Sequence, residues 1–199
     1  MGKVPVGERL KAYGLDEAHT KLDDLNIAAG VNHDLSAKNA TMAAHTKTLY
    51  PQSVDDLRRW LGSGAHAALS PVTTHLAPLT ARSGVVDFHT IADITRPLPA
   101  ALTTAHTAAL YAAAHRYVLS NDHGLEPAVV ANLNQWIVKL KPGISLFHFQ
   151  DIRVAAGAKL TINAANSVLF ARYITIEKTG KIVTKVSVAK IDCAGIKGH

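Results

Sequence analysis

Short runs of alternating apolar and polar residues fill the last quarter of the chain, residues 144–199. β-Branched and aromatic residues dominate these runs, and Gly, Asn and Lys separate them, which is typical of strands joined by tight turns. Before this region the apolar residues recur at helical spacing, most clearly over residues 127–140. The pattern therefore predicts an α+β protein. Residues 1–141 should be mostly helical and residues 144–199 rich in β-structure, with both regions packed together as one unit.

Further helices are expected in the region over residues 1–141. Residues 16–30 place apolar side chains on one face and end at a glycine, and residues 36–49 are rich in alanine. Ser53 and Asp56 have the spacing of a capping box, which predicts the start of a short helix. A run rich in Ala and Leu over residues 99–119 predicts another helix.

Two segments of the β-rich region look like copies of one unit. Residues 152–160 and residues 174–182 each run apolar, polar, apolar, followed by a short link, Gly, Lys and an apolar residue. Their first isoleucines are 22 residues apart, and their glycines, Gly157 and Gly180, are 23 apart. A truncated third copy is expected to begin at Ile191. A period near 22 residues fits one coil of a β-solenoid, in which each coil buries its inward side chains by stacking on a neighbour.

This region resembles a short right-handed parallel β-helix, of the general kind seen in pectate-lyase-like proteins and in bacterial filament-forming solenoids. The resemblance covers the last 55 or so residues of the chain. The alternative interpretation is an ordinary antiparallel sheet, in which turns separate strands about 8–12 residues apart. The expected fold is therefore a helical N-terminal part followed by a short C-terminal β-solenoid or β-sheet.

The positive charge of the chain is concentrated in the β-rich region. The 199 residues carry a net charge of +6, and the part from Lys139 onward has ten basic and three acidic side chains. Such asymmetry is typical of an anion-binding surface. It is also expected of lysines that prevent strand edges from aggregating. Aromatic residues make up only 6% of the chain, so nucleic-acid binding through base stacking is not expected.

The sequence predicts a soluble, cytoplasmic protein without a membrane partner. No run approaches the roughly 18 apolar residues that a membrane span needs, and the first residues lack the apolar core of a signal peptide. Cys193 is the single cysteine, which excludes an intramolecular disulfide and zinc sites built from several cysteines. Strand alternation places Cys193 on the inward face, where a buried and inert thiol is expected.

No motif in the sequence names a reaction. Eleven histidines are present, but no two have the three- or four-residue spacing of ligands on one helix. We therefore expect no metal site and no cofactor. Phosphate-binding glycine motifs and the nucleophile elbow of hydrolases do not occur either, so no catalytic residue is assigned.

The leading hypothesis is a non-enzymatic assembly or binding module whose β-rich part stacks on another copy or presents a basic surface. A homo-oligomer is expected, with an anionic polymer as a further partner. The alternative is an enzyme or sugar-binding protein that acts on an anionic polymer such as an acidic polysaccharide, with His148 transferring protons. A third option is a helper protein with a pocket between the helices and the sheet. The ligand-binding candidates are the polar and basic residues of the β-rich region: His148, Gln150, Arg153, Lys159, Arg172 and Lys181.

A stack of two or three coils leaves unpaired backbone groups at both ends. The helix that ends at Leu140 is expected to pack on the first β segment and to cap the N-terminal side. The C-terminal side should meet a second copy through residues 186–196, where Val188 is an outward-stacking position. Otherwise residues 65–96 should cover it as a lid.

Overall fold

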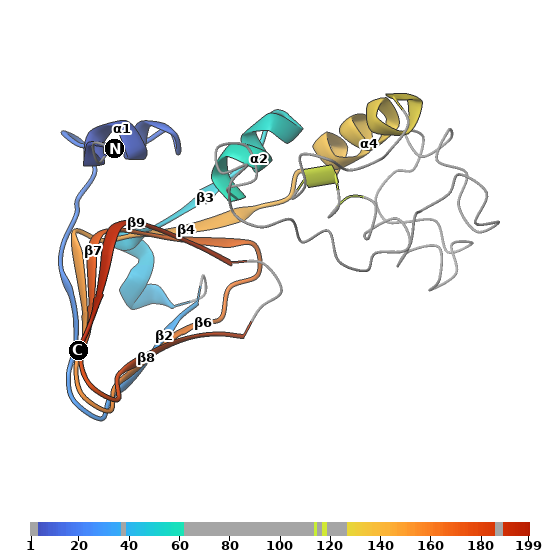
Figure 1. The fold of residues 1–199 in the computed structure, drawn as a ribbon. Helices are drawn as coiled ribbons and strands as arrows, with labels where there is room; N and C mark the ends of the chain where they lie inside the picture. Colours follow the sequence, from blue (N-terminus) through green and yellow to red (C-terminus); the bar gives the residue numbers. More distant parts are fainter. Residues whose placement is uncertain (1–3, 37–38, 62–113, 115–116, 119–126, 186–188) are drawn as a thin grey trace. The chain divides into compact units, whose positions relative to one another are not determined.

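The protein has an α+β fold made of a few helices and a curled, mixed sheet (Figure 1). It divides into two compact units, which we call the β unit (residues 1–49 and 143–199) and the helical unit (residues 50–142). No described helix is long and apolar enough to cross a membrane. A computed structural model describes residues 4–36, 39–61, 114, 117–118, 127–185 and 189–199.

The β unit draws strands from both ends of the chain. It also contains the helix α1 (Val6–Lys11) and the 3-10 helix η1 (Ala40–His45). Its strands are β1 (Leu25–Ile27), β2 (Asn32–Leu35), β3 (Thr46–Leu49), β4 (Ile144–His148), β5 (Asp151–Val154), β6 (Lys159–Ile162), β7 (Ser167–Ile176), β8 (Lys181–Thr184) and β9 (Ala189–Gly198).

These strands form two sheets. One has the order β1-β5-β7-β4-β3, with β9 also paired to β7, and the other has the order β2-β6-β8. Figure 1 shows β2, β6 and β8 side by side along one side of the unit, and β4, β7 and β9 along another. Every described pairing is parallel except that of β3 with β4. An antiparallel sheet over the C-terminal strands is therefore wrong.

The predicted period is confirmed by the register of the strands. Ile152 is paired with Ile174, and Ile174 with Ile196. In the second sheet Lys159 is paired with Lys181, at the same spacing along the chain. Two details of the predicted copies are wrong. The third isoleucine of the row is Ile196 and not Ile191, and this spacing places Gly157 beside Thr179 rather than Gly180.

The first turn of strands comes from a segment that was expected to be helical. Residues 25–27 pair with β5 and residues 32–35 pair with β6, and the offset in sequence is the same in both ladders. The expected helix over residues 16–30 is therefore wrong. The expected helix over residues 36–49 is reduced to the 3-10 helix η1, and β3 takes the place of its last part. The reason is tertiary: Ala155 N–H donates to the carbonyl of Ile27 at 3.1 Å, and Gly30 N–H donates to that of Ala156 at 3.2 Å. These parallel ladders outweigh the helix propensity of the alanines.

Three stacked corners join the two sheets at left-handed backbone positions. Gly30, Gly157 and Thr179 are equivalent in the register and have φ values of 72°, 69° and 68°. Glycine adopts this conformation freely, whereas Thr179 must be held there by its surroundings. Its hydroxyl accepts a hydrogen bond from the N–H of Gly157 at 2.9 Å, which ties the third corner to the second. The stack thus sets the backbone of each corner through its neighbour.

The inward side chains of both sheets form one core. The fully or nearly fully buried members include residues from each turn of strands and Met42 from η1. They are Ile27, Leu35, Met42, Phe147, Phe149, Ile152, Val154, Ala158, Leu160, Ile162, Ala164, Leu169, Ala171 and Ile174. Since these residues recur along the stack, burial depends on neighbouring turns rather than on one local hairpin.

The helical unit confirms two of the predicted helices. α2 (Val54–Leu61) begins with the expected capping box, in which Asp56 N–H donates to Ser53 Oγ and Ser53 N–H donates to Asp56 Oδ2, both at 3.2 Å. α4 (Pro127–Leu140) buries Trp136 on the predicted stripe. Most of the expected helix over residues 99–119 lies outside the described residues. The expected packing of α4 on the first β segment stays a prediction.

Gly180 provides a direct test of how tightly the corners are stacked. A Cβ atom at this position would lie 2.9 Å from the carbonyl oxygens of Val154 and Ala155, and backbone atoms cannot swing away. Gly180→Ala should therefore lower the free energy of unfolding by about 1–3 kcal/mol, the usual cost of overpacking. Gly198→Ala is the matched control, because its Cβ would meet nothing within 4 Å. Equal midpoints for the two variants in urea unfolding would contradict this packing.

Candidate functional site

His148 and Gln150, two of the predicted ligand-binding residues, are held by neighbouring segments of the β unit. His148 ends β4 and is only 6% exposed. Gln150 donates its backbone N–H to the carbonyl of Asp23 at 2.9 Å and accepts from the N–H of Arg172 at 2.6 Å. Its main chain is therefore part of the stack. A ligand does not reach the imidazole of His148 from solvent in this conformation.

The two predicted arginines are engaged with carboxylates of adjacent turns. Arg172 donates to Asp151 from Nε at 3.0 Å and from Nη2 at 2.5 Å. Arg153 donates to Glu177 from the same two nitrogens at 2.7 and 2.5 Å. Hydrogen bonds from these arginines hold the pKa values of Asp151 and Glu177 below their ordinary values. The pairs are partly to largely exposed, so each adds little to the free energy of unfolding.

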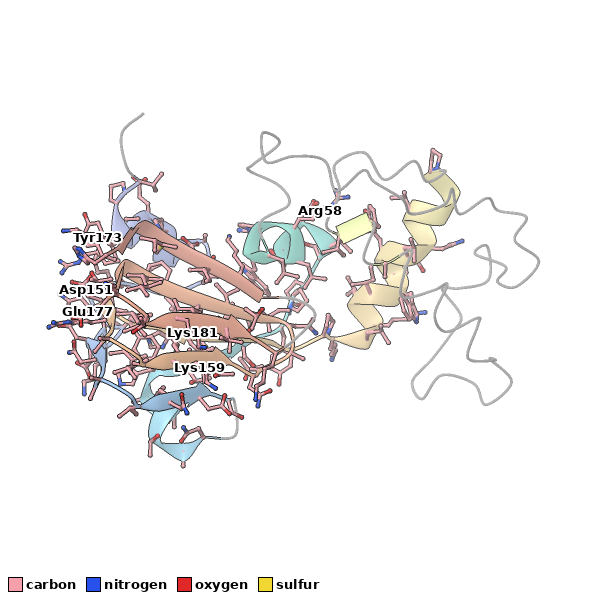
Figure 2. The ribbon with its side chains drawn as sticks, turned by 60° about the horizontal axis from the view of Figure 1, so that its bottom comes forward. Arg58, Asp151, Lys159, Tyr173, Glu177 and Lys181 are labelled. Atoms are coloured by element: carbon pink, nitrogen blue, oxygen red, sulfur yellow. The ribbon has the colours of Figure 1, made fainter. Side chains whose placement is uncertain are left out.

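The two predicted lysines are brought together on the other sheet. Lys159 of β6 and Lys181 of β8 are register partners, so their side chains leave the sheet from adjacent strands. Neither ammonium group forms an ion pair with an acidic side chain in the part of the chain that the structure describes. Figure 2 shows this pair apart from Asp151 and Glu177, which lie along one margin of the unit. The six candidates therefore form separate groups and not one site.

The last turn of strands ends the stack, and its inward side chains have no further turn among the described residues to cover them. Within one row of inward residues, Ile152 and Ile174 are 1% and 0% exposed, whereas Ile196 is 56% exposed. Three further apolar residues of the last turn pack against the core and are only partly buried: Ile182, Ile191 and Cys193. Among the described residues, β9 pairs only with β7 and β8 only with β6. We call the edges of β8 and β9 with these four side chains the open end.

The opposite end of the stack is partly covered by the chain itself. η1 follows β2, and its Met42 is part of the buried core cluster. β3 then pairs antiparallel with β4, with Thr46 opposite Phe147 and Leu49 opposite Ile144. These elements occupy the free edge of β4. The two ends of the unit therefore differ. At one end η1 covers the core and β3 occupies the edge of β4, while β1 and β2 are edge strands among the described residues. The other end is the open end.

An ionic contact that no sequence pattern indicated joins α1 to β9. The guanidinium of Arg9 donates to Asp192 Oδ1 at 2.9 and 2.7 Å, and Tyr13 Oη donates to Asp192 Oδ2 at 2.5 Å. Burial, together with the charge of Asp192, raises the pKa of Tyr13 far above its ordinary value, so the phenol keeps its proton. The partners come from opposite ends of the sequence, and no local pattern could have paired them.

Neither Cys193 nor a metal cluster marks a reactive centre among the described residues. Cys193 is partly buried, and desolvation raises its pKa, which disfavours the nucleophilic thiolate. No group of three His, Cys, Asp or Glu side chains in the described ranges has the geometry to hold a metal ion. Val188 and the proposed lid over residues 65–96 lie outside the described residues.

The features that remain for a function are the open end and the pair of register-matched lysines. Both follow from the stacking of parallel strands, and neither resembles a catalytic constellation. Comparison with known proteins adds no assignment: no family model, no curated protein and no solved structure matches this chain.

Proposed function

We propose that the protein is a non-enzymatic assembly module, in which the β unit is a short parallel β-solenoid that binds a second copy of itself through the open end. The observation that carries the proposal is the exposure of Ile196. The same position is buried in both preceding turns, so a further layer of strands is what would bury it.

The chemistry of the open end favours a partner with a β-strand edge. One side of β9 offers backbone donors and acceptors that the described strands do not pair, and only another backbone edge satisfies them in series. The apolar side chains Ile191 and Ile196 stand beside this edge. A second copy supplies a strand edge and an apolar surface of the same kind, which makes the contact self-complementary.

The charges of β9 also permit close approach of two copies. Asp192 is paired with Arg9 at 2.7 Å and with Lys190 at 3.7 Å within the chain. An approaching strand thus does not meet an unpaired carboxylate near the middle of β9. At the opposite end η1 covers the core and β3 occupies the edge of β4, so the exposed apolar side chains of one open end are matched best by those of another. This arrangement favours a closed dimer with two-fold symmetry over a filament.

Ile196→Asp tests the contact directly. The new carboxylate would have to leave water inside an apolar interface, at a cost of several kcal/mol, so the dimer Kd should rise by about a hundredfold or more. Sedimentation velocity over a concentration series would measure the Kd. A wild-type protein that stays monomeric at high micromolar concentration would contradict the proposal.

Val31→Asp is the matched control for this experiment. Val31 is an exposed apolar residue of the same β unit, but it lies in the corner between β1 and β2 and not at the open end. The Val31→Asp variant should dimerise like the wild type. Circular dichroism of both variants should match the wild type, which separates loss of the contact from loss of the fold.

A second candidate function is binding of an anionic polymer, such as an acidic polysaccharide. It is favoured by the pairing of Lys159 with Lys181, since like charges on adjacent strands repel unless an anion lies between them. The rigid spacing of strands would present both ammonium groups to one extended ligand. The ion pairs of Arg153 and Arg172 make these two arginines the weaker candidates.

The double substitution Lys159→Ala, Lys181→Ala tests this second function. Its affinity for polygalacturonate at low salt should fall by about tenfold or more, and added salt should weaken wild-type binding. Lys178→Ala removes one exposed lysine from a corner of the same unit and serves as the control. Isothermal titration calorimetry would measure each Kd. An equal loss of affinity in the control and in the double variant would show that binding depends on net charge and not on this pair of lysines.

A further inference from the structure

Two histidines meet where the covering segment joins the β unit. His45 is the last residue of η1, and His148 is the last residue of β4. The antiparallel register that pairs Thr46 with Phe147 brings these two residues side by side. Their ring centroids are 6.2 Å apart, and the ring of His45 also stacks on Phe149 at 5.3 Å.

Few groups are available to stabilise positive charge at this pair. Nδ1 of His45 and Nδ1 of His148 are both buried and have no hydrogen-bond partner in the described part of the protein. Asp23 is the facing carboxylate, 3.6 Å from Nε2 of His45, and it is shared with Lys21 at 2.8 Å. Lys47, from β3, adds a second positive charge near His148.

Asp23 therefore faces His45 and not His148, and no described carboxylate balances a positive charge on His148. Burial lowers the pKa of His148 below its ordinary value, and the charges of His45 and Lys47 lower it further, while a backbone hydrogen bond at Lys21 opposes them. If η1 and β3 separate from β4, water reaches His148 and the pKa of His148 returns to about 6.5. The packing of η1 and β3 on β4 is therefore most stable above that pH. It loses stability as the pH falls, because His148 binds a proton more readily once the two segments have separated.

We propose that the His45–His148 pair is an acid-sensitive latch, which releases η1 and β3 (Ala40–Leu49) from β4 when the pH falls. The unprotonated rings pack closely and keep β3 on the edge of β4. Protonation of His148 places a positive charge in a buried site beside Lys47 of the neighbouring strand, which is destabilising. η1 and β3 then separate from the rest of the β unit. The edge of β4 and the part of the core that Met42 covers become available to another strand. This inference does not depend on dimerisation through the open end.

Hydrogen exchange of backbone amides at pH 7.5 and pH 5.0 tests the latch, after correction for intrinsic exchange rates. The amides of β3 should lose protection by about tenfold or more, because each proton taken up on release changes the opening equilibrium by up to tenfold per pH unit. The amides of β5 and β7 should keep theirs, because these strands lie outside the latch. Unchanged protection of β3 at the lower pH would overturn the proposal.

Substitutions of the pair identify the sensor. His148→Phe keeps an aromatic ring in the buried position and removes the titration, so β3 should stay protected at pH 5.0. His45→Gln supplies a second test if the first variant fails to fold. His19→Gln is the control, since the His19 side chain is 83% exposed and pairs with Asp16. Loss of β3 protection in both latch variants, equal to that of the wild type, would overturn the assignment.

Discussion

The in-register stacking of parallel strands is the constraint on which the β unit depends. Each turn buries its inward side chains only where another turn lies beside it, as the row Ile152, Ile174 and Ile196 shows by its change from buried to exposed. The same register fixes the corners, where the Thr179 hydroxyl accepts a hydrogen bond from the N–H of Gly157. Burial, corner conformation and the outward rows of charge are therefore consequences of one register.

The two ends of this stack differ in the elements that cover them. More than 100 residues separate β2 from β4 in the sequence. The first of them form η1 and β3, and β3 pairs with β4. At the other end, β9 has no described strand beyond it. In the proposed function, the apolar side chains exposed at this open end are buried by pairing with one other copy. The latch at His45 and His148 would make the covered end responsive to pH.

The sequence revealed the repeat where two copies follow each other closely, because Ile152 and Ile174 occupy equivalent places in similar surroundings. It missed the first turn of strands, which lies far earlier in the chain. A signal was present: Ala28-Ala29-Gly30 is identical to Ala155-Ala156-Gly157, and both follow an apolar-polar-apolar run. The alanines favour a helix locally. The strands that hold this segment in β-structure lie more than 100 residues later in the sequence. The burial of His148 was likewise not predictable, because His45 and β3 come from a distant segment.

The claim that β9 is an interface edge is tested most directly by its own amides. In a parallel ladder, alternate N–H groups of β9 point away from β7, and no described strand lies on that side. Hydrogen exchange measured by NMR across a range of protein concentrations would follow them one by one. If two copies pair edge to edge, these outward amides gain protection as the concentration rises, while those bonded to β7 change little. Outward amides that exchange equally fast at every concentration would contradict the account.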